Sequence, residues 1–135
     1  MPPIPGVSQG HHDLSHHGKD PTKIAQLKIL EVEKLKILRD FLTQLKQTQE
    51  EDGENLLDRT MVFFSSNLAD ASKHSVKNLP VLLAGGGFKH GQHLAFDENN
   101  NLPLSNLFVS MLQRMGIVAD KFGSSTGTLT GLEAS

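Results

Sequence analysis

Two short apolar segments place the strongest constraint on what this chain can fold into. Residues 60–66 read TMVFFSS and residues 79–84 read LPVLLA. Neither alternates apolar with polar positions, which is typical of strands buried on both faces. Pro80 suits the second strand only because it stands near its start. With a short third strand at residues 93–96, these segments predict an α/β fold, a partial sheet of two or three strands covered by helices.

One long helix is expected before the first strand. Asp20 is a candidate N-cap, and Pro21 suits the first helical position. Apolar residues then recur at helical spacing over residues 24–45, so the helix should run for roughly 26 residues, about 39 Å. Within it, Glu31 and Lys34 are expected to pair at i,i+3.

A second helix and the domain limits can also be predicted from the sequence. Residues 103–115 carry a second apolar stripe at helical spacing, and Gly116 is a candidate helix stop. We expect residues 1–10 to be an extended N-terminal segment, 11–116 to be the α/β domain, and 117–135 to be a Gly/Ser/Thr-rich tail. Two helices cannot cover both faces of two fully buried strands, and the outer edges of those strands would still need further strands to pair with. We therefore expect the C-terminal part of a larger domain whose N-terminal half is missing.

Composition excludes several classes of function. The chain of 135 residues has a formal net charge of −2, so it offers no basic field for nucleic acid. It contains no cysteine, which excludes thiolate metal ligands and cysteine nucleophiles. No apolar run approaches the roughly 20 residues of a membrane helix. The first residues do not read as a signal peptide, so on this ground alone a cytoplasmic protein stays open.

Four of the seven histidines fall in one short run, HHDLSHHG at residues 11–18. Histidine is the commonest metal ligand in proteins, and neutral imidazoles combine with carboxylates around zinc and similar ions. His16 and His17 are therefore candidate metal ligands. The alternative is an ordered loop in which the imidazoles hydrogen-bond to the backbone. Both interpretations stay open at this point.

The loop after the first strand is the second candidate region. Ligands of open α/β sheets gather beyond the carboxyl ends of the strands. Asn67, Asp70 and His74 would lie there as candidate metal ligands, with Ser66 orienting a substrate. The alternative is an ordinary polar loop.

A glycine-rich segment, GGGFKHG at residues 85–91, is the third candidate region. Lys89, His90 and His93 are candidate contacts for an anion such as phosphate or sulfate. The segment lacks the spacing of a phosphate-binding loop and no helix is expected directly after it. A tight turn is the alternative interpretation.

Several short motifs occur in one order along the chain: HHDLSHHG, LLDRT at 56–60, NLPVLLAGGG at 78–87, LSNL at 104–107 and FGSST at 122–126. Over roughly residues 5–132 the chain resembles the C-terminal portion of an uncharacterised bacterial family, domain of unknown function fifteen-fifty-two. Members of that family are generally longer and usually begin with a twin-arginine-type export signal. The resemblance therefore implies a periplasmic or otherwise exported protein, with no established activity.

A more distant resemblance is to the alkaline phosphatase and sulfatase superfamily, carried by FFSSN at 63–67, His74 and the strand at 80–87. It implies that His74 is a metal ligand, whereas Asn67 stands where that superfamily has Asp-His. The implied function is hydrolysis of a phosphate or sulfate ester with a divalent ion, zinc, manganese or calcium. The nucleophile would lie in the missing half, so this chain alone should be inactive. The alternatives are a non-catalytic cell-envelope binding or structural protein of the same fold, and a metal-binding protein without turnover.

Overall fold

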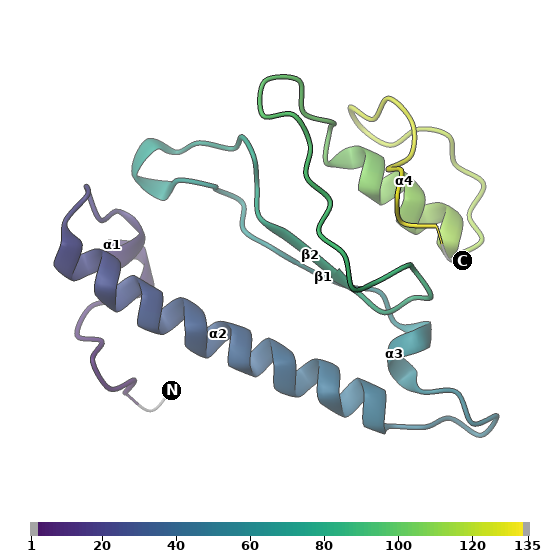
Figure 1. Ribbon diagram of the computed structural model, residues 1–135, viewed down its shortest axis with the longest axis horizontal. Helices are drawn as coiled ribbons and strands as arrows, with labels where there is room; N and C mark the ends of the chain where they lie inside the picture. The colour runs from purple at the N-terminus through teal and green to yellow at the C-terminus, as the bar shows by residue number, and fades with distance from the viewer. Residues whose placement is uncertain (1–2, 134–135) are drawn as a thin grey trace. The chain divides into compact units, whose positions relative to one another are not determined.

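The computed structural model describes residues 3–133 and combines helices with a two-stranded antiparallel sheet, a mixed α/β fold. In chain order the elements are α1 (His11–Ser15), α2 (Pro21–Gln47), α3 (Leu56–Arg59), β1 (Val62–Ser65), the 3-10 helix η1 (Ala71–Lys73), β2 (Val81–Ala84) and α4 (Ser105–Arg114) (Figure 1).

The described residues divide into two compact units. The first unit comprises residues up to Thr48 together with Ser65–Val81, and the second comprises Gln49–Phe64 together with the residues from Leu82 on. The domain limits expected from the sequence remain a prediction.

The long helix of the first unit confirms the sequence prediction. α2 begins at Pro21, and the Asp20 carboxylate accepts hydrogen bonds from the backbone N–H groups of Thr22 (2.8 Å) and Lys23 (3.4 Å). This N-cap satisfies donors that the first helical turn leaves without partners. α1 packs against α2 (Figure 1).

The apolar stripe of α2 is less buried than its periodicity suggests. Leu38 is the buried residue of this helix, whereas Leu35 is 48% exposed and Ile37 is 63% exposed. The periodicity therefore predicted the position of the helix correctly, but it did not predict how far its apolar stripe is buried. Among the described residues, no helix is both long enough and apolar enough to cross a bilayer.

The two strands form where the apolar segments predicted them, but their environment was predicted wrongly. β1 is half-buried along its length, and in β2 Val81 and Leu82 are 41% and 38% exposed. The pair is a two-stranded antiparallel ribbon rather than the interior of a helix-covered sheet. An unbroken apolar run reflects strand propensity, and it does not show whether both faces are covered.

The third strand expected at residues 93–96 is absent from the described structure. The chain before it is bonded to the C-terminal tail instead. The Lys89 N–H donates to the Leu132 carbonyl (3.1 Å), and the Gln92 amide donates to the Gly131 carbonyl. These bonds tie residues 89–92 to the tail, and residues 93–96 form no strand.

α4 and the tail form the core of the second unit. Leu107, Val109 and Leu132 are buried there. The Phe108 ring lies edge-on to Phe63 of β1 and to Phe122 of the tail, with centroids 5.4 Å and 5.9 Å away. The helix confirms the prediction for residues 103–115, and Gly116 follows its end with a φ of +79°.

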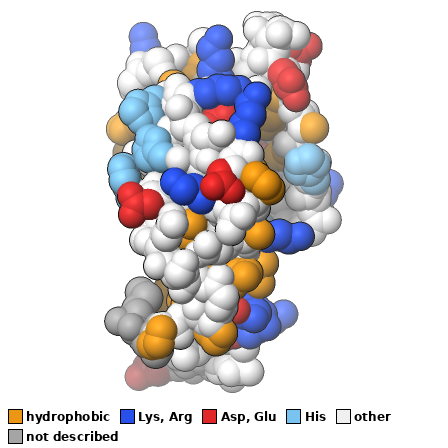
Figure 2. All heavy atoms as spheres, turned by 90° about the vertical axis from the view of Figure 1, so that its left-hand side faces the viewer, with side chains coloured by type: hydrophobic (Ala, Val, Ile, Leu, Met, Phe, Trp, Pro, Cys, Tyr) orange, Lys and Arg blue, Asp and Glu red, His pale blue; other side chains and the backbone are white. Residues whose placement is uncertain are grey.

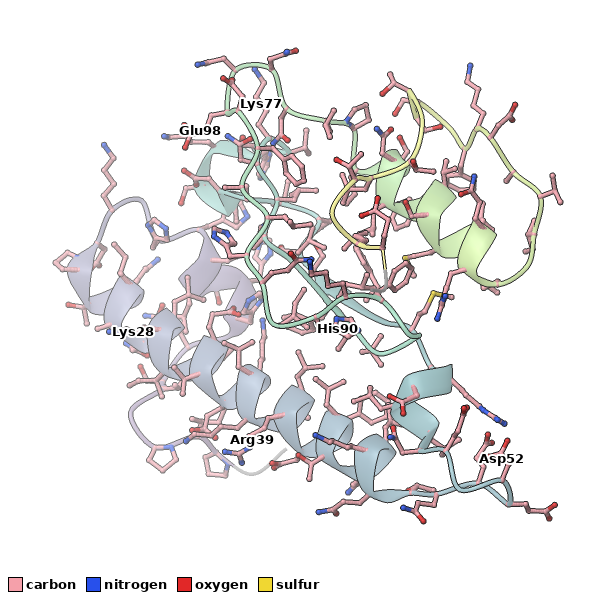
Figure 3. The ribbon with its side chains drawn as sticks, turned by 45° about the vertical axis from the view of Figure 1, so that its right-hand side comes forward. Lys28, Arg39, Asp52, Lys77, His90 and Glu98 are labelled. Carbon is pink, nitrogen blue, oxygen red and sulfur yellow. The ribbon has the colours of Figure 1, made fainter. Side chains whose placement is uncertain are left out.

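The loop between α2 and α3 is closed by one arginine. Arg59 forms ion pairs with Glu50 (2.6 Å), Glu54 (2.9 Å) and Asp52, which lies in that loop (Figure 3). The backbone N–H of Glu54 and the Arg59 guanidinium lower the pKa of Asp52. These carboxylates therefore serve the loop's own structure.

Candidate functional site

The histidine run folds into a short helix that sequence analysis did not predict. His12 lies in α1 and His16 is the C-cap residue four positions later, and their rings lie together, with centroids 4.7 Å apart and ring planes inclined at 52°. Leu14, between them in sequence, is fully buried. The helix thus turns an apolar side chain inward and leaves imidazoles at the surface. Figure 2, turned so that the left-hand side of Figure 1 faces the viewer, shows histidine side chains grouped at the surface.

A polar triad holds the start of α1 to α2. His11 Nε2 lies 2.9 Å from Glu31 Oε1 and 2.8 Å from Lys34 Nζ, and Lys34 donates to Glu31 at 2.9 Å. The predicted Glu31–Lys34 pair is therefore confirmed. Partial burial of the Glu31 carboxylate opposes its ionisation, but the hydrogen bonds and charges of Lys34 and His11 outweigh burial and lower the pKa of Glu31.

The loop after β1 presents His74 on a tightly folded turn. The Asp70 carboxylate accepts from the Lys73 N–H (3.2 Å), and the Ser75 N–H donates to the Asp70 carbonyl (3.0 Å). His74 follows η1 in the left-handed conformation, with φ +50° and ψ +36°. That conformation is unfavourable for a residue with a side chain. Its ring is thus directed by the closed turn that carries it.

His16 and His74 come together in the first unit. Their ring centroids lie 5.1 Å apart, with the ring planes at 84°. His16 therefore contacts both His12 and His74, and the histidine run and the loop after β1 meet at this ring. His16 is half-buried, whereas His12 and His74 are exposed. Two imidazoles from distant parts of the sequence and a third from α1 form one surface cluster, which we call the histidine cluster: His12, His16 and His74.

The other candidate ligands of the first unit have local roles. His17 Nδ1 accepts from the Lys19 N–H at 3.0 Å, which locks its ring into the turn after α1. The Asp70 carboxylate caps η1 and lies 3.6 Å from Lys73 Nζ. Asn67 is exposed in the turn that follows β1, and Ser66 Oγ accepts from the Leu68 N–H at 3.3 Å. Within residues 3–133, no three histidine, aspartate or glutamate side chains are arranged so that they could hold a metal ion together.

The anion candidates of the glycine-rich segment belong to the second unit. His90 Nε2 lies 2.9 Å from the Gly85 carbonyl oxygen, so the ring closes the turn on itself (Figure 3). Lys89 and His93 have exposed side chains. Gly85, Gly86 and Gly87 all have positive φ angles and form a tight turn, as the alternative interpretation expected.

Sequence reasoning did not single out His12 as a partner of His16, although a signal was present. Two histidines at i,i+4 share a face once the run is helical. The run was interpreted as a metal site or an ordered loop, and no helix was predicted there; α1 has no side-chain N-cap and spans five residues. Its helical form depends on tertiary contacts, which a short isolated helix needs in order to persist.

Comparison with known proteins returned no match of any kind, neither to a family model, nor to a curated protein, nor to a solved structure.

Proposed function

We propose that His16 and His74, within the histidine cluster, are the metal-binding part of a phosphate- or sulfate-ester hydrolase-like domain of the alkaline phosphatase type. The observation that carries the proposal is the contact between the His16 and His74 rings, 5.1 Å between centroids. Both residues are candidate ligands on sequence grounds, one from the resemblance and one from the density of histidines. The resemblance also implies export of the protein.

The donor chemistry favours zinc among the divalent ions considered. Imidazole nitrogens suit zinc, whereas calcium prefers oxygen ligands and manganese favours carboxylates. His16 and His74 would hold the ion, and the remaining positions would be open to water or to an anionic ester. Catalytic zinc sites commonly have three protein ligands, so two imidazoles alone make an open and weak site.

Zinc bound there would lower the pKa of a bound water molecule and would place a positive charge beside the ester. The chain's own residues have simpler tasks. α1 and the turn after η1 hold the two imidazoles next to each other, and His12 lies against His16 at 4.7 Å between ring centroids. The resemblance assigns the nucleophile to a preceding half of the domain, so the chain by itself should not turn over an ester.

The test is a calorimetric titration of the full chain with zinc chloride at neutral pH. We expect binding by the unaltered chain, and at least about tenfold weaker binding after His16→Ala or His74→Ala, on the scale of losses seen when metal sites are perturbed. His93→Ala, an exposed histidine of the second unit, is the matched control and should bind as the unaltered chain does. Equal losses in all three variants would show unspecific imidazole binding and contradict the proposal.

A chain that binds no zinc, manganese or calcium would support the alternative, a non-catalytic cell-envelope binding or structural protein. Hydrolysis of p-nitrophenyl phosphate and p-nitrophenyl sulfate should be absent with the isolated chain. Turnover that persists after His16→Ala and His74→Ala would place the chemistry elsewhere in the chain.

A further inference from the structure

One serine side chain connects the two segments that carry the histidine cluster. Ser72 Oγ accepts a hydrogen bond from the Gly18 N–H at 3.2 Å and donates one to the Ser15 carbonyl at 3.4 Å. Both partners belong to the turn that ends α1, and this turn contains His16 and His17. The hydroxyl thus uses its acceptor and its single proton on the two sides of one turn.

The position of Ser72 makes this connection effective. It is the middle residue of η1 and stands two residues before His74. The loop around it is closed by its own backbone, because the Ala69 N–H donates to the Ser75 carbonyl at 2.8 Å. A hydroxyl on a closed loop can therefore fix the distance between that loop and the end of α1.

α1 depends on such a connection. A helix of five residues without a side-chain N-cap has little stability of its own. Its start is held to α2 through His11, Glu31 and Lys34. Ser72 holds its other end, which carries His16.

We propose that Ser72 is a positioning residue of the histidine cluster: its hydroxyl holds the turn after α1 so that His16 faces His74. The importance of this role for zinc binding rests on the proposed function. The role itself, setting the distance between two rings, does not depend on a metal.

The experiment compares three variants of the full chain. Ser72→Ala removes both hydrogen bonds, Ser72→Thr keeps a hydroxyl at the same position, and Ser75→Ala is the control. Ser75 lies in the same loop, but its hydroxyl accepts only a local bond, from the Lys77 N–H at 3.4 Å. Two quantities are measured for each: the nuclear Overhauser effect between the His16 and His74 ring protons without metal, and the zinc dissociation constant.

We expect Ser72→Ala to lose the nuclear Overhauser effect between the His16 and His74 rings. It should also bind zinc about tenfold more weakly, in the range found for residues that orient metal ligands. Ser72→Thr should restore both quantities, and Ser75→Ala should change neither. The thermal unfolding temperatures of Ser72→Ala and Ser75→Ala should agree, since Ser72 is exposed and Ser75 is only half-buried.

A ring-to-ring effect that survives in Ser72→Ala would overturn the proposal, and so would a Ser72→Thr variant that behaves like Ser72→Ala. If the unaltered chain shows the effect but binds no zinc, the proposed function fails while the positioning role is still decided by the metal-free measurement. The two failures are therefore distinguishable.

Discussion

The imidazole rings of His16 and His74 lie edge to face, 5.1 Å between centroids, although one follows α1 and the other follows η1. His16 reaches this position from a helix that Leu14 anchors, and His74 reaches it from a left-handed residue on a closed turn. The contact joins two segments of the first unit that the sequence separates by the whole of α2 and β1.

The backbone of His74 leads to the first prediction. A residue with a Cβ loses about 1–2 kcal/mol in the left-handed region, whereas glycine does not. His74→Gly should therefore be more stable than His74→Ala by about 1 kcal/mol, measured by urea unfolding. Both variants should lose the contact with His16. Equal stabilities would contradict the left-handed conformation at φ +50°.

The second prediction concerns the buried end of β2. A Cβ at Gly85 would lie 2.2 Å from the carbonyl oxygens of Leu57 and Thr60, whereas one at Gly91 would meet nothing within 4 Å. Both glycines have positive φ, +73° and +78°, so the conformational cost of alanine is shared. Gly91→Ala should lose about 1 kcal/mol of unfolding free energy, and Gly85→Ala about 3 kcal/mol or more. Similar losses in both would show that the second unit tolerates the overlap.

The third prediction concerns the polar anchor of the tail. Asn106 is 3% exposed; its Oδ1 accepts from the Thr126 N–H at 2.9 Å, and its Nδ2 donates to Thr126 Oγ1 (3.2 Å) and to the Thr128 carbonyl (3.4 Å). Asn106→Ala removes the buried amide that is bonded to the Thr126 N–H and the Thr128 carbonyl, and should cost about 1–2 kcal/mol. Hydrogen exchange at Thr126 should accelerate. Asn99→Ala changes an exposed side chain of the same unit and should alter neither the unfolding free energy nor the exchange rate at Thr126.

The fourth prediction concerns the anchor of α1. Leu14 is fully buried, so Leu14→Ala removes apolar contacts and leaves a cavity. We expect a loss of about 3 kcal/mol in unfolding free energy and a separation of His16 from His74. Ile37→Ala on α2, where the side chain is 63% exposed, should cost less than about 0.5 kcal/mol. A large effect of Ile37→Ala would mean that the exposed stripe of α2 is covered.

The fifth prediction is a pH dependence that follows from Glu31. Its pKa in the folded chain is lowered from the usual 4.5. The interaction of the Glu31 carboxylate with Lys34 and His11 therefore stabilises the fold fully at pH values above 4.5. The stabilisation is lost as pH falls through the lowered value. Because the carboxylate is 45% exposed, Glu31→Gln should cost only about 0.5 kcal/mol at neutral pH. The difference from the unaltered chain should vanish in strong acid.

The control for that measurement is Glu33→Gln, which removes the i,i+3 pair with Lys36 on the same helix (2.7 Å) and leaves α1 untouched. A pH profile identical to that of Glu31→Gln would mean that helix charge, rather than the triad with His11, accounts for the effect.

The sequence located those elements whose causes are local. Asp20 and Pro21 mark the start of α2, and Gly116 marks the stop after α4, because caps and periodicity act within a few residues. The positions of β1 and β2 followed from strand-forming residues, but their predicted burial was wrong. Burial depends on what packs against a strand, and an apolar run is compatible with either outcome.

The candidate site divides in the same way. Histidine density and the resemblance selected His16 and His74 as ligands, a choice that stays a prediction. Their contact, the helical form of α1 and the connection through Ser72 were decided only by the tertiary structure. Hydrogen bonds between segments this far apart in sequence, such as the one from Gly18 to Ser72, have no local signature. The sequence by itself thus determined which side chains are candidate ligands, and the fold determined which of them face each other, because that depends on how separate turns pack.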